Sequence, residues 1–305
     1  KLFLILFISV QLNSFSQQYF PTNPDVKSKN NPFIALTNAT IVISPGDVIE
    51  DASILIKDGK IVEVGVDLEL PKNTVIHNKS GMYIYPSFID ISNSFGTPKP
   101  KSGSSYSRSV EYKASRQGFY WNDHILSDYN SITDFQYDNK KSKQLREYGF
   151  GVVNTHRKDG VHRGTGALIA LDDKSSNSFR ILKPYSTENL SFQRSSRFSQ
   201  AYPSSIMGSI ALLRQFYHDL EWYKNGGSTS RDLAIESAIK NYSLPKIFST
   251  GNKLNVIRAL KLSKELEFNS IIEGSGYEFE NINDLKNYSK VLVIPDNFPK
   301  PSDLT

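Results

Sequence analysis

Histidines and their neighbours are the first residues of this sequence that could do chemistry. Cysteine is absent from the 305 residues, and five histidines are present. Two of them, His156 and His162, fall in one short stretch and could hold a metal ion or an anion in a loop. The same stretch contains Arg157, Lys158 and Arg163, which would repel a metal ion. The favoured interpretation is therefore a solvated basic loop, with a relocated metal site as the alternative.

Several other kinds of site are excluded by the sequence. Without cysteine the chain has no disulfide, no thiolate metal ligand and no cysteine nucleophile. The Gly-x-Ser-x-Gly sequence that positions the nucleophile of many serine hydrolases does not occur. Gly164-Thr165-Gly166 lacks the third glycine and the following helix of a dinucleotide-binding loop. The net charge of +5 is modest, and we expect no nucleic-acid partner.

A secretory signal peptide is predicted over residues 1–17. Lys1 precedes an apolar run over residues 2–10, and small polar residues follow this run, which is typical of such signals. The run is too short to span a membrane, and no membrane span is expected after the signal is removed. We expect an exported protein, periplasmic or extracellular in a bacterium, because an exported chain without cysteine suits a bacterial envelope.

A small all-β unit is expected next, within residues 18–85. After a polar, proline-containing lead-in, short apolar strands follow one another from Phe33. Asp58-Gly59 separates two of these strands, and both residue types tolerate the positive φ angles of a type I′ turn. The flanking strands, residues 52–57 and 60–65, should therefore pair as a hairpin.

Strands alternate with helices from residue 86 to residue 305, which is typical of a parallel sheet built from βαβ units. A buried strand is expected over residues 87–91, with Phe88 or Ile89 facing a packed core. Residues 97–143 are interpreted as an inserted surface loop, because Ser, Lys, Gly and Pro are frequent at its start. The remaining expected elements are strands 150–155, 167–171, 246–249, 270–273 and 290–294, and helices 204–224, 231–242, 253–268 and 281–288.

Three stretches together resemble the opening of an amidohydrolase, of the imidazolonepropionase-like branch. They are residues 36–41, 58–61 and 81–90, which include an Asp-Gly-Lys-Ile hairpin and a Pro-Ser-Phe-Ile-Asp strand. Later pieces agree, and the resemblance covers most of residues 33–295. It implies an α/β fold, a metal-dependent-hydrolase-type (β/α)8 barrel, with a composite β-sandwich at residues 18–85. The barrel would be incomplete over residues 86–305, because eight strands need roughly 250 residues and a long insertion interrupts this part.

The resemblance also implies where metal ligands would stand, and this chain departs from that pattern. Ser92 and Ser94 occupy the positions of a His-x-His pair on the first barrel strand. The strand 5 histidine position falls on or beside Ser249, and the strand 6 position falls on Gly274. Hydroxyls and glycine cannot replace imidazole as strong zinc ligands. We therefore predict no metal site and name no catalytic residue here. Asp90 is interpreted as an acceptor of local backbone N–H groups.

Two functions remain open. In the favoured one, the chain is the N-terminal part of an exported amidohydrolase that acts on C–N bonds of amides, cyclic amides or dipeptides, and this half is a scaffold. A divalent metal, with zinc expected, would then belong to a downstream amidohydrolase unit of the same polypeptide. In the other, the chain is a non-catalytic binding protein that recognises a peptide or small amide. Both give it a small-molecule or peptide-like ligand.

Overall fold

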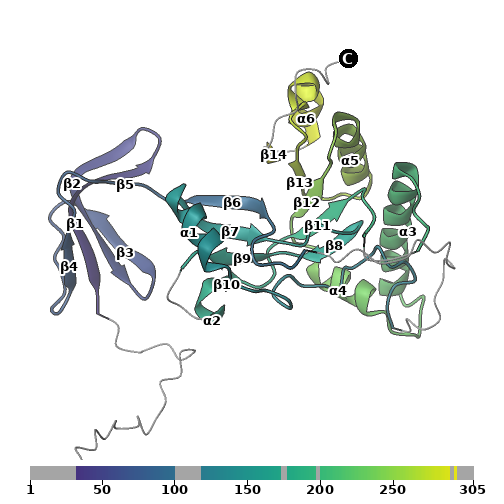
Figure 1. Ribbon diagram of the computed structural model, residues 1–305, viewed down its shortest axis with the longest axis horizontal. Coiled ribbons are helices and arrows are strands. Elements are labelled where there is room, and N and C mark those ends of the chain that lie inside the picture. Colours follow the sequence, from purple (N-terminus) through teal and green to yellow (C-terminus); the bar gives the residue numbers. More distant parts are fainter. Residues whose placement is uncertain (1–31, 100–117, 173–176, 197–199, 289–291, 294–305) are drawn as a thin grey trace, which may run out of the picture.

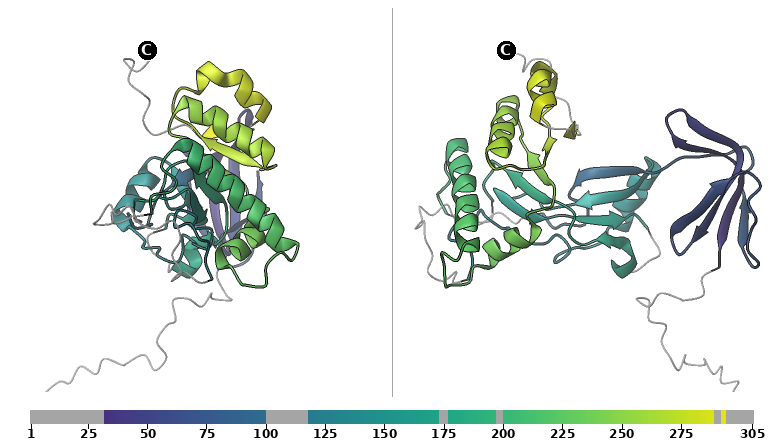
Figure 2. Two further views of the ribbon diagram at one scale, coloured as in Figure 1. Left: turned by 90° about the vertical axis from the view of Figure 1, so that its right-hand side faces the viewer. Right: turned by 180° about the vertical axis from the view of Figure 1, so that it is seen from behind.

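A computed structural model describes residues 32–99, 118–172, 177–196, 200–288 and 292–293. The predicted signal peptide, most of the lead-in and residues 100–117 of the predicted insertion lie outside these ranges. The molecule is elongated, with the N-terminal sheet at one end and the larger α/β part extending from it (Figures 1 and 2). Among the described helices, none has the length and apolar character needed to cross a membrane.

Five strands form the N-terminal sheet: β1 (Ile34–Ser44), β2 (Asp47–Lys57), β3 (Lys60–Gly65), β4 (Val75–Asn78) and β5 (Tyr83–Ile84). Their order is β3-β2-β1-β4, and β5 pairs with β1 further along that strand. Asp58 and Gly59 have φ angles of 51° and 73°, so the predicted hairpin between β2 and β3 is confirmed. The described N-terminal residues form this one sheet, so the predicted two-layer sandwich stays a prediction.

The larger part contains two sheets, ordered β10-β9-β7-β6 and β14-β13-β12-β11-β8. Their strands are β6 (Phe88–Asn93), β7 (Phe150–Thr155), β8 (His162–Thr165), β9 (Ala167–Ala170), β10 (Ile181–Lys183), β11 (Glu188–Ser191), β12 (Lys246–Ser249), β13 (Ser270–Glu273) and β14 (Leu292–Val293). The helices are α1 (Asn139–Glu147), α2 (Asn177–Arg180), α3 (Ile206–Lys224), α4 (Leu233–Asn241), α5 (Lys253–Glu265) and α6 (Ile282–Tyr288), with a 3-10 turn, η2, at Glu278–Asn281.

One antiparallel stretch, β8 and β9, links the two sheets. β6 is parallel to β7, and β11 to β14 are parallel to one another. Between them β8 runs antiparallel to β11, and β9 runs antiparallel to β7. Gly166 lies between β8 and β9, where the chain stops pairing with β11 and starts pairing with β7. A Cβ at this position would come within 2.7 Å of the Thr187 hydroxyl oxygen. The expectation of a purely parallel sheet is therefore wrong, and the described strands form a mixed α/β arrangement.

The main core lies between the β11–β13 strands and the helices α3, α4 and α5. Ser205 caps α3, since its hydroxyl accepts a hydrogen bond from the backbone N–H of Gly208 at 3.1 Å, and the helix starts close to the predicted residue 204. Ile210, Leu213 and Tyr217 lie on one face of α3, and all three are buried in this core. The apolar face of α3 therefore packs inward, as the helical spacing of these residues favours.

Two expectations about burial are wrong. Phe88 and Ile89 are 65% and 58% exposed. Neighbouring residues of a strand point to opposite faces, so neither face of β6 is covered at these positions. Part of the predicted surface insertion is instead buried, chiefly residues 120–131, and α1 begins within its last residues. Ile125 and Asn130 form bridges with His162 and Thr165 of β8, so this segment runs along the edge of that strand.

Truncation of Phe88 and Ile89 to Ala should lower the free energy of unfolding by at most about 1 kcal/mol, because exposed side chains contribute little packing. Ile169→Ala in β9 is the matched control. Ile169 is fully buried, so its truncation should cost about 2–5 kcal/mol. Urea unfolding of the three proteins measures both values. An equally large loss for the double variant would show that another segment covers β6.

Candidate functional site

A pocket of about 210 Å³ opens at the carboxyl ends of β12 and β13, and we call it the strand-end pocket. Ser249 and Glu273 are the last residues of these two strands, and Lys158 and Arg163 reach the pocket from the segment around β8. The rest of the lining is Gln193, Thr250, Gly251 and Gly274. Ligands of open α/β sheets commonly bind at the carboxyl ends of the strands, so this is the candidate functional site.

Charged groups of the strand-end pocket form a connected network. Lys158 Nζ lies 3.0 Å from Glu273 Oε1, and the Ser249 hydroxyl donates to Glu273 Oε2. Arg163 Nη1 donates to Ser249 Oγ at 2.9 Å. Burial raises the pKa of Glu273, but Lys158 and the Ser249 hydrogen bond outweigh it, so the pKa lies below its usual range. Glu273 is therefore an ionised carboxylate with two partners already bound.

His156 follows β7 and contacts the first of the predicted metal positions. Its Nε2 lies 2.9 Å from Ser92 Oγ, and its Nδ1 lies 3.0 Å from the carbonyl oxygen of Arg157. Because a carbonyl only accepts, Nδ1 carries the proton and Nε2 accepts the Ser92 hydroxyl. Burial lowers the pKa of His156 to about 4, and the Arg163 charge acts in the same direction. His156 is thus neutral at pH 7 and fully hydrogen-bonded.

His162 does not reach the strand-end pocket. It begins β8 and lies beside Glu188 and Lys246, which begin β11 and β12, at the other end of these two strands. Its Nε2 is 3.8 Å from Glu188 Oε1, and Lys246 Nζ is 2.8 Å from Glu188 Oε2. Burial lowers the pKa of His162 to about 3 and raises that of Glu188 to about 7, although Lys246 opposes the second shift. His156 and His162 therefore belong to different clusters.

The interpretation of residues 156–163 as a solvated basic loop is wrong. His156, Arg157, His162 and Arg163 are all buried, and Lys158 alone of the five is substantially exposed. Arg157 shows how this is achieved, since its guanidinium stacks on the Tyr129 ring at 3.4 Å and lies 3.5 Å from Asp134. These neighbours are distant in sequence, and no local pattern could have predicted the burial.

The remaining predicted positions divide between the pocket and local structure. Ser249 and Gly274 line the strand-end pocket, at the ends of β12 and β13. Ser94 accepts from Thr97 through its carbonyl. Asp90 accepts from the backbone N–H of Ser92 at 3.1 Å, which confirms its local role.

The strand-end pocket does not suit a divalent metal ion. Its one carboxylate, Glu273, is bound by Lys158 and Ser249, and the two cations Lys158 and Arg163 would repel a metal ion. Neutral His156 uses its free nitrogen to accept the Ser92 hydroxyl. Nowhere in the described ranges do three His, Asp or Glu side chains gather in a way that could hold a metal ion.

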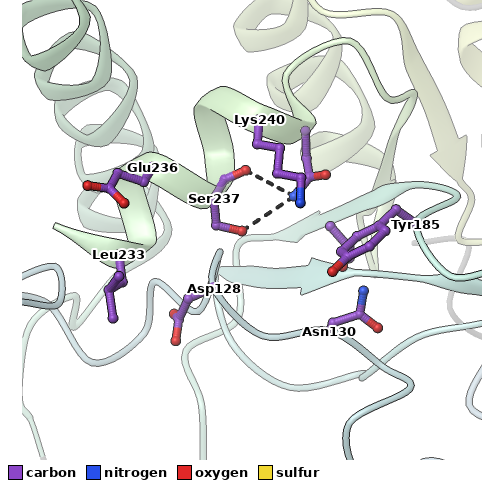
Figure 3. Close-up of a pocket in the computed structure, with 9 residues that line it drawn as sticks. Asp128, Asn130, Tyr185, Leu233, Glu236, Ser237 and Lys240 are labelled. Atoms are coloured by element: carbon purple, nitrogen blue, oxygen red, sulfur yellow. Dashed lines mark hydrogen bonds between the residues drawn. The ribbon is translucent and has the colours of Figure 1, made fainter.

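A second pocket of about 330 Å³ lies near the start of β11 and β12 (Figure 3). Ser237 and Lys240 of α4 form one wall, and the Tyr185 ring lies opposite, 5.2 Å from Lys240 Nζ. Glu236 at its rim is held by Arg231 at 2.6 Å and by the Tyr223 hydroxyl at 3.0 Å. Since this carboxylate is already satisfied, the pocket is a weaker candidate than the strand-end pocket.

Comparison with known proteins reveals similarity of structure only. No protein-family model matches the chain, and a search of curated proteins found no match. An amidohydrolase from Thermotoga maritima superposes with a TM-score of 0.66 at 18% identity, covering 86% of this chain and 70% of that chain. The superposed part of this chain shares the fold of that amidohydrolase. The predicted resemblance is thereby confirmed for the fold.

Two further structures superpose more loosely. A prolidase complexed with N-methylphosphonate-L-proline has a TM-score of 0.41 at 13% identity, with 86% of this chain and 66% of that chain covered. A D-hydantoinase from Thermus sp. has a TM-score of 0.29 at 14% identity, with 79% and 57% covered. The chain thus spans about two thirds or less of these two proteins, and no argument rests on them.

Mild acid should destabilise this amidohydrolase fold through its buried histidines. The pKa values of His156 and His162 fall from 6.5 to about 4 and about 3 on folding, so the unfolded chain binds their protons first. The free energy of unfolding should therefore decrease as the pH falls from about 6.5 towards 4. His156→Asn should make this decrease shallower. Urea unfolding at a series of pH values measures the slope, and identical slopes would contradict the assignment.

Proposed function

We propose that this chain is the N-terminal part of an exported hydrolase that acts on amide C–N bonds, and that this part is a scaffold. The amidohydrolase fold supports the reaction class by analogy. The observation that carries the scaffold role is the chemistry of the strand-end pocket. There Lys158, Arg163 and Ser249 surround Glu273, and this set cannot hold the metal ion that such hydrolysis uses.

The catalytic metal, with zinc expected, would be held in a downstream amidohydrolase unit of the same polypeptide. When bound, such a metal lowers the pKa of a water molecule and supplies hydroxide at neutral pH. The residues of this chain would contribute packing, and the paired charges of the strand-end pocket would keep the strand ends in place. The substrate would be a small amide, a cyclic amide or a dipeptide.

A non-catalytic binding protein is the second candidate. The pocket itself favours it, because its polar lining and two cations could recognise a peptide or small amide without turnover. The two functions differ in an observable way. A binding protein would lack hydrolytic activity over its full length, whereas the scaffold function requires an active unit elsewhere in the polypeptide.

Metal analysis of the full-length protein tests the scaffold role. Zinc per chain should be at least one, and it should be unchanged in His156→Asn and in Glu273→Gln, because neither residue is expected to hold the ion. Elemental analysis after gel filtration gives the stoichiometry. Loss of zinc in either variant would contradict the proposal, and absence of zinc together with absence of hydrolysis in the wild type would favour the binding protein.

Restoring the histidine pair gives a second test. The double change of Ser92→His and Ser94→His should leave kcat per folded molecule unchanged, because Ser249 and Gly274 would still supply no imidazole from the strand ends, even if His156 joined the restored pair. The double change of Ser92→Ala and Ser94→Ala is the matched control for disturbance of β6. Hydrolysis of N-acyl amino acids, dipeptides and hydantoin with and without added zinc is the measurement. A zinc-dependent rise in kcat in the histidine variant alone would show that the site can be rebuilt.

A further inference from the structure

Arg163 is a buried cation without a carboxylate partner. It is 3% exposed, yet it lines the strand-end pocket. Its Nε donates to the carbonyl oxygen of Gly160 at 3.2 Å and its Nη1 donates to Ser249 Oγ at 2.9 Å, so both acceptors are neutral. Within the described residues, no Asp or Glu lies at ion-pair distance from this guanidinium.

The carboxylates closest to Arg163 are engaged elsewhere. Glu273 is paired with Lys158 at 3.0 Å and accepts the Ser249 hydroxyl. Asp159 accepts the Ser195 hydroxyl at 2.5 Å and the backbone N–H of Ser196 at 2.9 Å. Among the residues that line the pocket, Lys158 and Glu273 cancel, so the lining retains one positive charge, which belongs to Arg163. Asp159 lies outside the lining, and its charge acts on Arg163 without an ion pair.

Such an uncompensated charge is unusual inside a protein. Arginine is almost never fully buried unless it is paired, because removing its charge from water is costly. Burial lowers the pKa of Arg163 to about 10, so the group is still a cation at neutral pH. Arg157 is the contrast within this chain, since it is equally buried but lies 3.5 Å from Asp134. Of these two guanidinium groups, Arg163 lines the strand-end pocket, and Arg157 is not among its lining residues.

Other groups around the strand-end pocket also favour an anion. The helix α5 begins at Lys253, directly after the pocket residues Thr250 and Gly251, so its positive dipole end lies on this side. The side-chain amide of Gln193 lines the pocket and lies 3.8 Å from where a Cβ on Gly251 would be. An amide N–H there can donate to a ligand oxygen.

We infer that the strand-end pocket binds a small carboxylate anion, with the Arg163 guanidinium as its main ligand. A planar guanidinium matches a planar carboxylate in two parallel hydrogen bonds. The volume of about 210 Å³ equals about seven water molecules, which suits a ligand the size of an amino acid. This inference goes beyond the scaffold role, and it holds whether or not a hydrolytic unit follows.

Isothermal titration of the full-length protein at low ionic strength and pH 7 tests the inference. The probes are acetate, N-acetylglycine, its neutral amide and inorganic phosphate. We expect the two carboxylates to bind, the neutral amide to bind at least tenfold more weakly than N-acetylglycine, and phosphate to bind more weakly than both carboxylates. Equal affinity for N-acetylglycine and its amide, or higher affinity for phosphate, would overturn the inference. It would also be overturned if neither carboxylate bound at concentrations up to about 10-fold above those of free amino acids in cells.

Variants assign the binding to Arg163. Arg163→Met should weaken N-acetylglycine binding at least tenfold and should not lower the melting temperature, because it removes an uncompensated buried charge. Arg157→Met is the matched control: it should lose stability and keep the affinity.

Glu273→Gln should tighten binding, since it releases Lys158. If Arg163→Met does not fold, Arg163→Lys, which keeps the charge but loses the planar fork, should still weaken binding. Unchanged affinity in both Arg163 variants would overturn the inference.

Discussion

The larger part of this molecule depends on the alternation of side chains along β8. In a strand, neighbouring side chains point to opposite faces of the sheet. His162 therefore points to α3, where its ring lies 5.5 Å from that of Phe216, and Arg163 points to the opposite side and reaches Ser249. Two adjacent polar residues thus enter two separate buried environments. A shift of one residue in the register of β8 would exchange them and place a guanidinium in the apolar core.

The two environments satisfy their charges differently. On the helix side, Lys246 is paired with Glu188 and also donates to the carbonyl oxygen of Leu244 at 3.0 Å. Its cation is therefore compensated inside the protein, and removal of either partner would leave a buried charge behind, at about 3–5 kcal/mol. On the pocket side, Arg163 has only neutral acceptors. The Lys246–Glu188 pair therefore needs no ligand, whereas the charge of Arg163 is balanced only when an anion enters the strand-end pocket.

Local signals in the sequence predicted the long helices and the β2–β3 hairpin. Side-chain caps mark the starts of α3, α4 and α5 at Ser205, Asp232 and Asn252, and these starts lie close to the predicted ones. The short strands β8 and β11 were missed because four residues rich in polar side chains show no alternation of apolar and polar positions. These strands are buried on both sides, so their polar side chains bond to protein groups instead of water: Arg163 donates to Ser249, and Asn189 and Ser191 donate to backbone carbonyl oxygens.

The candidate site was predictable in position but not in chemistry. The resemblance placed Ser249 and Gly274 at the strand ends, and both line the pocket. The partners of Glu273 are Lys158 and Ser249, and Arg163 reaches the same pocket through Ser249. Lys158 and Arg163 were interpreted as part of a solvated loop because the polar residues around them carry no sign of burial in the sequence. Their burial depends on contacts with residues 125–134, far away along the chain.

The positive charge at the strand ends of this chain therefore comes from side chains. A metal ion would bring two positive charges to one point and would need several anionic or imidazole ligands around it. Here two cations are spread over Lys158 and Arg163, and a single carboxylate, Glu273, balances one of them. The hydroxyls of Ser92 and Ser249 fit this arrangement, because they can bridge charged and neutral groups as both donors and acceptors. Ser92 and Ser249 thus hydrogen-bond to His156 and Glu273 in place of a metal ion. In this arrangement the positive charge of Arg163 favours an anionic ligand.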